Sequence, residues 1–109
     1  MYVSNMISNS GNPVVNQFVI TDDKDKEYFQ SYDVIVATKK TVRMYVPVSV
    51  NRQEIEDVSI IELDEKYWDY SKTTSKYLSR FLGMTKKEIA HGIKFDGANV
   101  RVTVTNLNK

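Results

Sequence analysis

The sequence contains no cysteine and only one histidine among its 109 residues. The absence of cysteine excludes disulfide bonds, thiolate nucleophiles and zinc sites built on sulfur, and it fits a reducing compartment. No window approaches the run of about 18 apolar residues that a membrane-spanning helix needs. Residues 1–11 also lack a basic leader followed by an apolar stretch. We therefore expect a cytoplasmic protein without a membrane segment.

Glycine is also scarce, and the four glycines do not have the spacing of a phosphate-binding loop. Asp23, Asp25 and Glu27 alternate like the start of a calcium loop. The sixth position of such a loop is Tyr28 instead of glycine, and the twelfth is Val34 instead of glutamate. A site for a transition metal would depend almost entirely on carboxylates. We expect no metal and no cofactor.

Catalytic motifs are missing as well. His91 could act as a general base only beside an orienting group and a nucleophile. A triad of His91 with Ser71 and Asp69 can be written, but serine and aspartate at the start of a helix are typical capping residues. We expect no catalytic residue and a non-enzymatic protein. An enzyme with an unrecognised site around His91 is the least favoured alternative.

The composition is that of one globular domain, with 41% hydrophobic and 27% charged residues. Residues 1–13 are rich in serine, asparagine, glycine and proline, which favour turns. We expect them to form a flexible N-terminal arm outside the core. Residues 14–109 should form a single α+β domain.

Alternating or β-rich apolar runs predict strands in five segments. The expected strands cover residues 14–20, 28–37, 42–50, 58–63 and 100–104. The second and third should form a hairpin that turns at Lys39 and Lys40, and 51–57 should be a loop. Pro47 indicates an edge or an irregularity in the third strand, because proline lacks an amide donor. An exposed edge there would permit a homodimer, and the oligomeric state stays open.

Two helices are expected between the last two strands. Apolar side chains recur with helical spacing up to Leu82, Ser71 or Asp69 can cap the start, and Gly83 can end the helix. Thr85 and Glu88 have the spacing of a capping box. The fold class is therefore α+β, an antiparallel or mixed sheet of about five strands, with helices at about 71–82 and 86–94 on one face. A turn at 96–97 should lead into the last strand.

Charge is unevenly distributed, because residues 1–65 hold 6 basic and 11 acidic side chains, whereas residues 66–109 hold 9 and 3. Two candidate binding surfaces result. The first is an acidic edge that could dock on a basic channel of a partner: Asp22, Asp23, Asp25, Glu27, Glu54, Glu56 and Asp57. The second is a basic helix face that could neutralise phosphates or an acidic patch: Lys72, Lys76, Arg80, Lys86 and Lys87. Ordinary solvated surface is the competing interpretation of both.

Aromatic residues cluster at Tyr67, Trp68 and Tyr70. Such a cluster buries a large area in a core or in an interface. We expect core packing, with Trp68 holding the loop against the start of the helix.

The segment from Trp68 to Leu82 reads WDYSKTTSKYLSRFL. It resembles a segment that recurs in small uncharacterised proteins of bacteriophages and prophages. The resemblance assigns no active-site residue, and it implies that the protein binds a host machine in the bacterial cytoplasm. Our leading hypothesis is a phage-encoded, non-enzymatic inhibitor of the anti-CRISPR type. It would block a bacterial protein or ribonucleoprotein complex, such as a CRISPR-Cas or other defence nuclease, by steric and electrostatic occlusion. The alternative is a small nucleic-acid-binding protein that uses the basic helix face.

Overall fold

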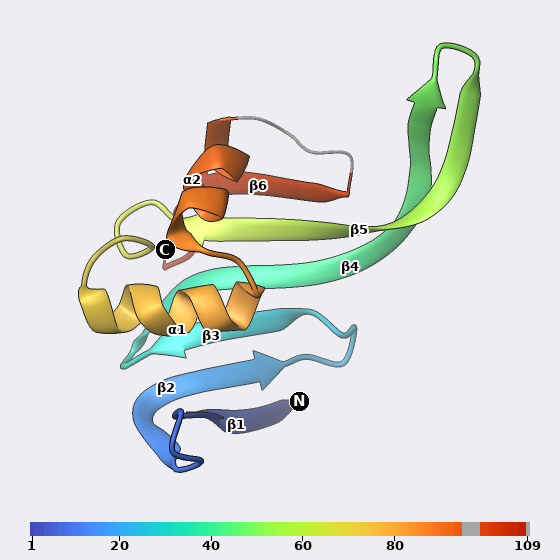
Figure 1. Ribbon diagram of the computed structural model, residues 1–109. Coiled ribbons are helices and arrows are strands. Elements are labelled where there is room, and N and C mark those ends of the chain that lie inside the picture. The colour runs from blue at the N-terminus through green and yellow to red at the C-terminus, as the bar shows by residue number, and fades with distance from the viewer. Residues whose placement is uncertain (95–98, 109) are drawn as a thin grey trace.

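The computed structural model describes residues 1–94 and 99–108 (Figure 1). The expected turn at 96–97 lies outside the described residues. The elements follow one another as β1 (Tyr2–Ile7), β2 (Pro13–Thr21), β3 (Glu27–Ser31), β4 (Val34–Ser49), β5 (Arg52–Asp64), α1 (Lys72–Leu82), α2 (Lys86–Lys94) and β6 (Val100–Thr105).

The strands form one six-stranded sheet in the order β1-β2-β3-β4-β5-β6. Neighbouring strands are antiparallel from β1 to β5, whereas β5 and β6 are parallel. Parallel neighbours need a long crossover connection, which α1 and α2 provide here. The predicted α+β class with two helices is confirmed, and of the two sheet types left open, antiparallel or mixed, the sheet is mixed. The sheet has one strand more than the five expected.

The core lies between the sheet and the two helices, which cover the same face of the sheet (Figure 1). Phe29 of β3 and Phe81 of α1 stack with their ring centroids 5.8 Å apart. Ile89 of α2 is 2% exposed, and Val102 of β6 belongs to the same cluster. Burial of these large side chains supplies most of the driving force for folding.

The predicted helix boundaries are confirmed by their caps. The Ser71 side chain accepts a hydrogen bond from the Thr74 amide, and Gly83 ends α1 in the left-handed conformation with φ of 66°. The Thr85 amide donates to the Glu88 carboxylate, and the Glu88 amide donates to the Thr85 hydroxyl. The caps at Ser71 and at Thr85 satisfy backbone amides that a helix start leaves without a partner, whereas at Gly83 the backbone amide donates to the Arg80 carbonyl in the last turn of α1.

The N-terminal segment does not stay outside the core, so that part of the prediction for residues 1–13 is wrong. Tyr2–Ile7 pair with β2 as an edge strand, and Met6 is part of the core cluster. The Arg80 guanidinium also donates to the Ile7 carbonyl. Serine and asparagine have low strand propensity, but pairing with a neighbouring strand overrides this preference.

The hairpin predicted at Lys39 and Lys40 is also wrong, because both lysines lie inside β4. The chain turns between β3 and β4 at Tyr32, whose φ is 57°, and at Asp33. The Lys39 ammonium reaches the Phe81 carbonyl at 2.9 Å, so the charged group is satisfied beside the core. The expected loop at 51–57 is mostly strand, since β5 begins at Arg52.

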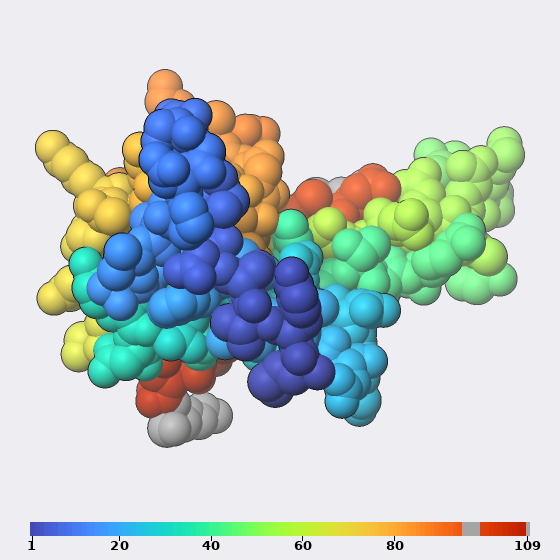
Figure 2. Space-filling view, turned by 90° about the horizontal axis from the view of Figure 1, so that it is seen from below, coloured from blue at the N-terminus to red at the C-terminus, as the bar shows by residue number. Residues whose placement is uncertain are grey.

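The outer halves of β4 and β5 leave the body as a two-stranded ribbon (Figures 1 and 2). This ribbon makes the molecule elongated, with principal extents of 50 × 33 × 28 Å. The register shifts between Pro47 and Ser49, which agrees with the irregularity expected at the proline.

The C-terminal segment is tied to the sheet. The Asn108 side chain donates both to the Asp64 carboxylate and to the Ile35 carbonyl.

Candidate binding surface on the first helix

The outer face of α1 carries lysine and serine side chains because its inner face is used by the core. Thr74, Tyr77, Leu78, Phe81 and Leu82 are buried against the sheet. Lys72 and Lys76 are four residues apart, so they project from the same, opposite side. Serine follows the same spacing at Ser71, Ser75 and Ser79.

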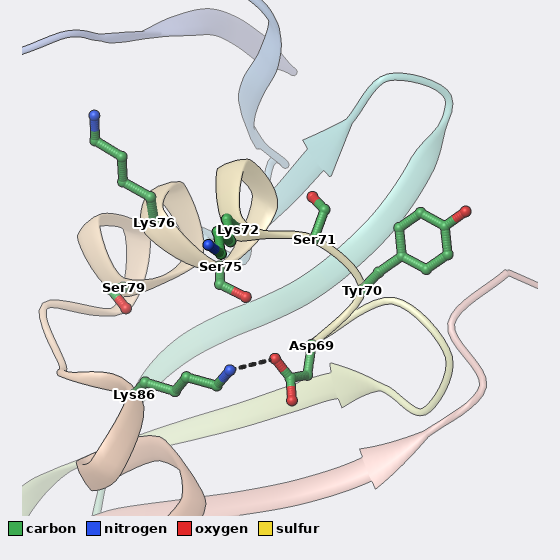
Figure 3. Close-up of a pocket in the computed structure, with 8 residues that line it drawn as sticks. All are labelled: Asp69, Tyr70, Ser71, Lys72, Ser75, Lys76, Ser79 and Lys86. Atoms are coloured by element: carbon green, nitrogen blue, oxygen red, sulfur yellow. Dashed lines mark ion pairs between the residues drawn. The ribbon is translucent and has the colours of Figure 1, made fainter.

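These side chains line an open pocket of about 480 Å³ between α1 and the start of α2 (Figure 3). Lys86 closes it from α2 and forms an ion pair of 2.6 Å with Asp69. Lys72 and Lys76 form no ion pair within the described part of the chain. The pocket therefore presents two lysine charges that no carboxylate compensates, together with serine hydroxyls that can donate hydrogen bonds.

The other two members of the predicted basic face have different positions. Arg80 turns toward the N-terminal strand, where its guanidinium donates to the Ile7 carbonyl at 2.6 Å and to the Asn9 side chain. It also lies over the Tyr77 ring at 5.5 Å. Arg80 therefore links α1 to the segment between β1 and β2. Lys87 is exposed on α2, outside the residues that line the pocket.

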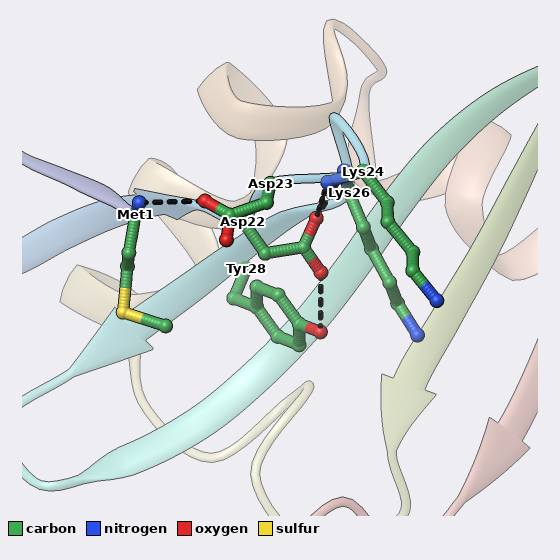
Figure 4. A network of polar contacts seen from close by, with 6 residues as sticks. All are labelled: Met1, Asp22, Asp23, Lys24, Lys26 and Tyr28. Atoms are coloured by element: carbon green, nitrogen blue, oxygen red, sulfur yellow. Dashed lines mark hydrogen bonds and ion pairs between the residues drawn. The ribbon is translucent and has the colours of Figure 1, made fainter.

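Part of the predicted acidic edge forms the turn between β2 and β3 (Figure 4). Asp22 accepts from the Lys24 and Lys26 amides at 2.8 and 3.0 Å and from the Tyr28 hydroxyl at 3.1 Å. The backbone bond from Lys26, followed by the one from Lys24, holds the pKa of Asp22 below its ordinary value. The Asp23 carboxylate lies 2.8 Å from the N-terminal amine. Both carboxylates thus have intramolecular partners.

The acidic side chains of Glu27, Glu54, Glu56 and Asp57 also have partners within the chain, and the last three lie on β5, away from the β2–β3 turn. Glu27 is 3.9 Å from Lys39, Glu54 is 2.9 Å from Arg52, and Asp57 is 3.6 Å from Arg43. Glu56 accepts from the side-chain NH₂ group of Asn99. Strands β3 and β4 separate the β2–β3 turn from the acidic part of β5 in the sheet order. Of the seven residues, only Asp25 shows no such contact.

A second, smaller pocket of about 260 Å³ lies beside the start of α1, and the sequence analysis did not predict it. Its walls include Tyr32, Tyr67 and Tyr70, which come from the β3–β4 turn and from the loop before α1. Tyr70 is 69% exposed, so the core packing expected for the aromatic cluster is wrong for this residue. The cluster of aromatic residues at 67–70 was the one sequence feature that could have indicated this pocket. Nothing in the sequence places Tyr32 beside that cluster.

The triad of His91, Ser71 and Asp69 considered from the sequence does not form as a unit, because Ser71 and Asp69 are engaged elsewhere. The Ser71 hydroxyl caps α1, Asp69 pairs with Lys86, and His91 lies on the exposed side of α2. Within residues 1–94 and 99–108, no three histidine, aspartate or glutamate side chains cluster as metal ligands. Neither of the described helices is long and apolar enough to cross a bilayer.

The fold and surface define a small α+β protein with a mixed sheet, a cationic helix face and a protruding ribbon. The chain belongs to DUF8033, a family of unknown function, which matches residues 1–97. No curated protein and no solved structure matches the chain.

Proposed function

We propose that this protein is a non-enzymatic binding protein that contacts the phosphate backbone of a nucleic acid through the face of α1. The observation that carries the proposal is the pocket of Lys72, Lys76 and Lys86 with the neighbouring serines. Phosphate recognition needs compact positive charges and hydrogen-bond donors at one surface, and this face supplies both. The acidic edge is the weaker candidate, since most of its carboxylates already bind partners within the chain.

The test measures fluorescence anisotropy of labelled single-stranded and duplex oligonucleotides over a series of salt concentrations. The affinity falls with salt, and each lost phosphate contact reduces the magnitude of the slope of log K against log salt by about 0.7 for single strands and about 0.9 for duplex. The Lys72→Ala/Lys76→Ala variant should therefore bind more weakly and with a shallower slope.

The matched control is Lys24→Ala/Arg101→Ala, which removes the same net charge elsewhere. Lys24 lies in the β2–β3 turn, and Arg101 is exposed on β6 next to Val102, which faces the core. Successive strand residues point to opposite faces, so Arg101 lies on the face without helices. Absence of salt-dependent binding, or equal losses in both double variants, would refute the proposal.

A second candidate is the inhibitor of a bacterial macromolecular complex, which the resemblance to phage proteins suggests. The ribbon favours it, because Tyr45, Val50 and Ile55 are more than half exposed there, with Val50 at 99%. Exposed apolar side chains at the end of an arm are suited to contact a protein surface. A nucleoprotein complex would offer partners for both the ribbon and the lysine face.

This second proposal is tested by adding the protein to purified CRISPR effector nucleases loaded with guide RNA and measuring target cleavage. We expect dose-dependent loss of cleavage by a susceptible effector, with less inhibition by Val50→Asp. Full cleavage by every effector type at a large molar excess of the protein would count against this function and leave nucleic-acid binding untouched.

A further inference from the structure

The pocket of about 260 Å³ walled by tyrosines, called the tyrosine pocket below, adjoins the pocket of about 480 Å³ lined by Lys72, Lys76 and Lys86, called the lysine pocket. Both are lined by Tyr70 and Ser71, so the loop before α1 forms their common border. In Figure 3 the Tyr70 ring points away from the ion pair of Asp69 and Lys86, toward the other side of this loop. A ligand that crosses the border would meet cationic groups on one side and aromatic rings on the other.

The aromatic walls are held by the fold. The Tyr67 and Tyr70 rings meet edge to face with centroids 5.6 Å apart. The Tyr70 amide donates to the Tyr67 carbonyl, and the Tyr67 amide donates to the buried Asp64 carboxylate. Such ordering before binding lowers the entropy cost of receiving a ligand.

Tyr32 contributes an exposed ring at a conformational cost. Its φ of 57° lies in the left-handed region, which a bulky side chain rarely adopts. The Tyr32 amide donates to the Asn16 carbonyl at 2.7 Å, and the Gln30 side chain donates to the Tyr32 carbonyl at 2.7 Å. Glycine or asparagine would occupy this turn with less strain, yet the chain places a tyrosine here that is 61% exposed.

The pocket also offers polar groups at its base and rim. The buried hydroxyls of Ser31 and Thr74 form a hydrogen bond of 3.2 Å with each other, and Asp33 contributes a carboxylate. The hydroxyl that accepts in this bond can still donate to the polar edge of a heterocyclic ring, and the Asp33 carboxylate can accept from it. A purely apolar ligand would gain nothing from them.

We propose that the tyrosine pocket receives an unstacked base of a single-stranded nucleic acid, while the neighbouring phosphates lie against Lys72 and Lys76. This inference rests on the proposed function and adds the class of ligand. Stacking on aromatic side chains together with a cationic surface is the usual basis of single-strand binding. Bases in a duplex are paired and stacked, so they cannot enter the pocket.

The experiment compares single-stranded and duplex oligonucleotides of the same sequence, as DNA and as RNA, by fluorescence anisotropy. Tyr70→Leu removes the ring, Tyr70→Phe keeps it, and Tyr2→Leu is the control because Tyr2 is similarly exposed, at 67%, on β1. We expect wild type to prefer single strands and Tyr70→Leu to bind them about tenfold more weakly. Tyr70→Phe and Tyr2→Leu should bind like wild type.

The outcomes separate this inference from the proposed function. Equal affinity of wild type for single strands and duplex, or equal behaviour of Tyr70→Leu and Tyr2→Leu, would overturn the base pocket alone. Unchanged duplex binding by Tyr70→Leu would show that the variant is folded. Failure of the wild-type protein to bind any of the oligonucleotides would overturn both proposals.

Discussion

Asp64 should be the carboxylate on which the loop before α1 and the C-terminal segment most depend. It lies at the end of β5, is 2% exposed, and accepts four hydrogen bonds. The Lys66 and Tyr67 amides donate to Oδ2 at 3.0 Å, and the Leu107 amide and the Asn108 side chain donate to Oδ1 at 2.9 Å. Burial disfavours the charge, but these bonds together hold the pKa of Asp64 below its ordinary value of 3.8.

Asp64→Asn keeps the shape of the side chain but replaces one acceptor oxygen by an NH₂ group and removes the charge. Each carboxylate oxygen of Asp64 accepts two hydrogen bonds. In either orientation of the new side chain, its NH₂ group replaces one of these oxygens, so two donors lose their acceptor and face another donor. Each hydrogen bond to a charged group contributes about 1.5 kcal/mol or more, so the free energy of unfolding should fall by about 3 kcal/mol near neutral pH. Urea denaturation at pH 7, followed by circular dichroism, measures this difference. Glu65→Gln is the control, because it makes the same charge change at the adjacent, exposed position.

The pH dependence gives a second, independent check. Because folding lowers the pKa of Asp64, its ionised form contributes stability above the pKa of the unfolded chain. That contribution is lost as the pH falls through the lower pKa of the folded state. The difference between wild type and Asp64→Asn should therefore be constant near neutrality and shrink below about pH 4. A variant within about 0.5 kcal/mol of wild type at pH 7, or a difference that does not shrink in acid, would refute this reasoning.

Two further substitutions test the packing and the capping of the helices. Gly92→Ala should lower the free energy of unfolding by about 1 kcal/mol, because the new Cβ would lie 2.9 Å from Val102 Cγ2. In a double-mutant cycle with Val102→Ala the two losses should be less than additive, whereas strict additivity would exclude the contact. Ser71→Ala should cost about 1 kcal/mol through loss of the cap on the Thr74 amide, while Ser75→Ala inside α1 should be close to neutral. Thermal melts of these variants decide both points, and equal melting temperatures for the two serine variants would contradict the capping argument.

Local signals predicted the helices well because caps and helical periodicity act over four residues or fewer. Ser71, Gly83 and the pair of Thr85 and Glu88 each form the contact that their spacing indicates. The β-rich runs likewise predicted where most strands lie. These features depend on neighbours in the chain, so they can be recognised without tertiary structure.

The misassigned turns have a different cause. Lys39 and Lys40 look like turn residues, but in the sheet the Lys39 ammonium bonds to the Phe81 carbonyl and lies 5.1 Å from the Phe81 ring centre. The actual turn contains Tyr32, which local preferences disfavour at positive φ. Long-range contacts decided both positions. The same is true of β1, in which Ser4 and Asn5 interrupt the apolar residues and pairing with β2 completes the strand.

The sequence by itself determined the fold class, the two helices with their caps and the asymmetry of charge, because composition, short-range spacing and capping produce them. Only the tertiary structure decided which charges remain available for a partner. It pairs most carboxylates of the acidic edge within the chain, directs Arg80 toward β1, and leaves Lys72 and Lys76 beside an open pocket. It also brings Tyr32 to Tyr67 and Tyr70 across about 35 residues of chain. A binding surface is made of side chains that folding brings together from distant parts of the chain. Local sequence patterns report only on neighbouring residues, so they do not predict which distant side chains will meet.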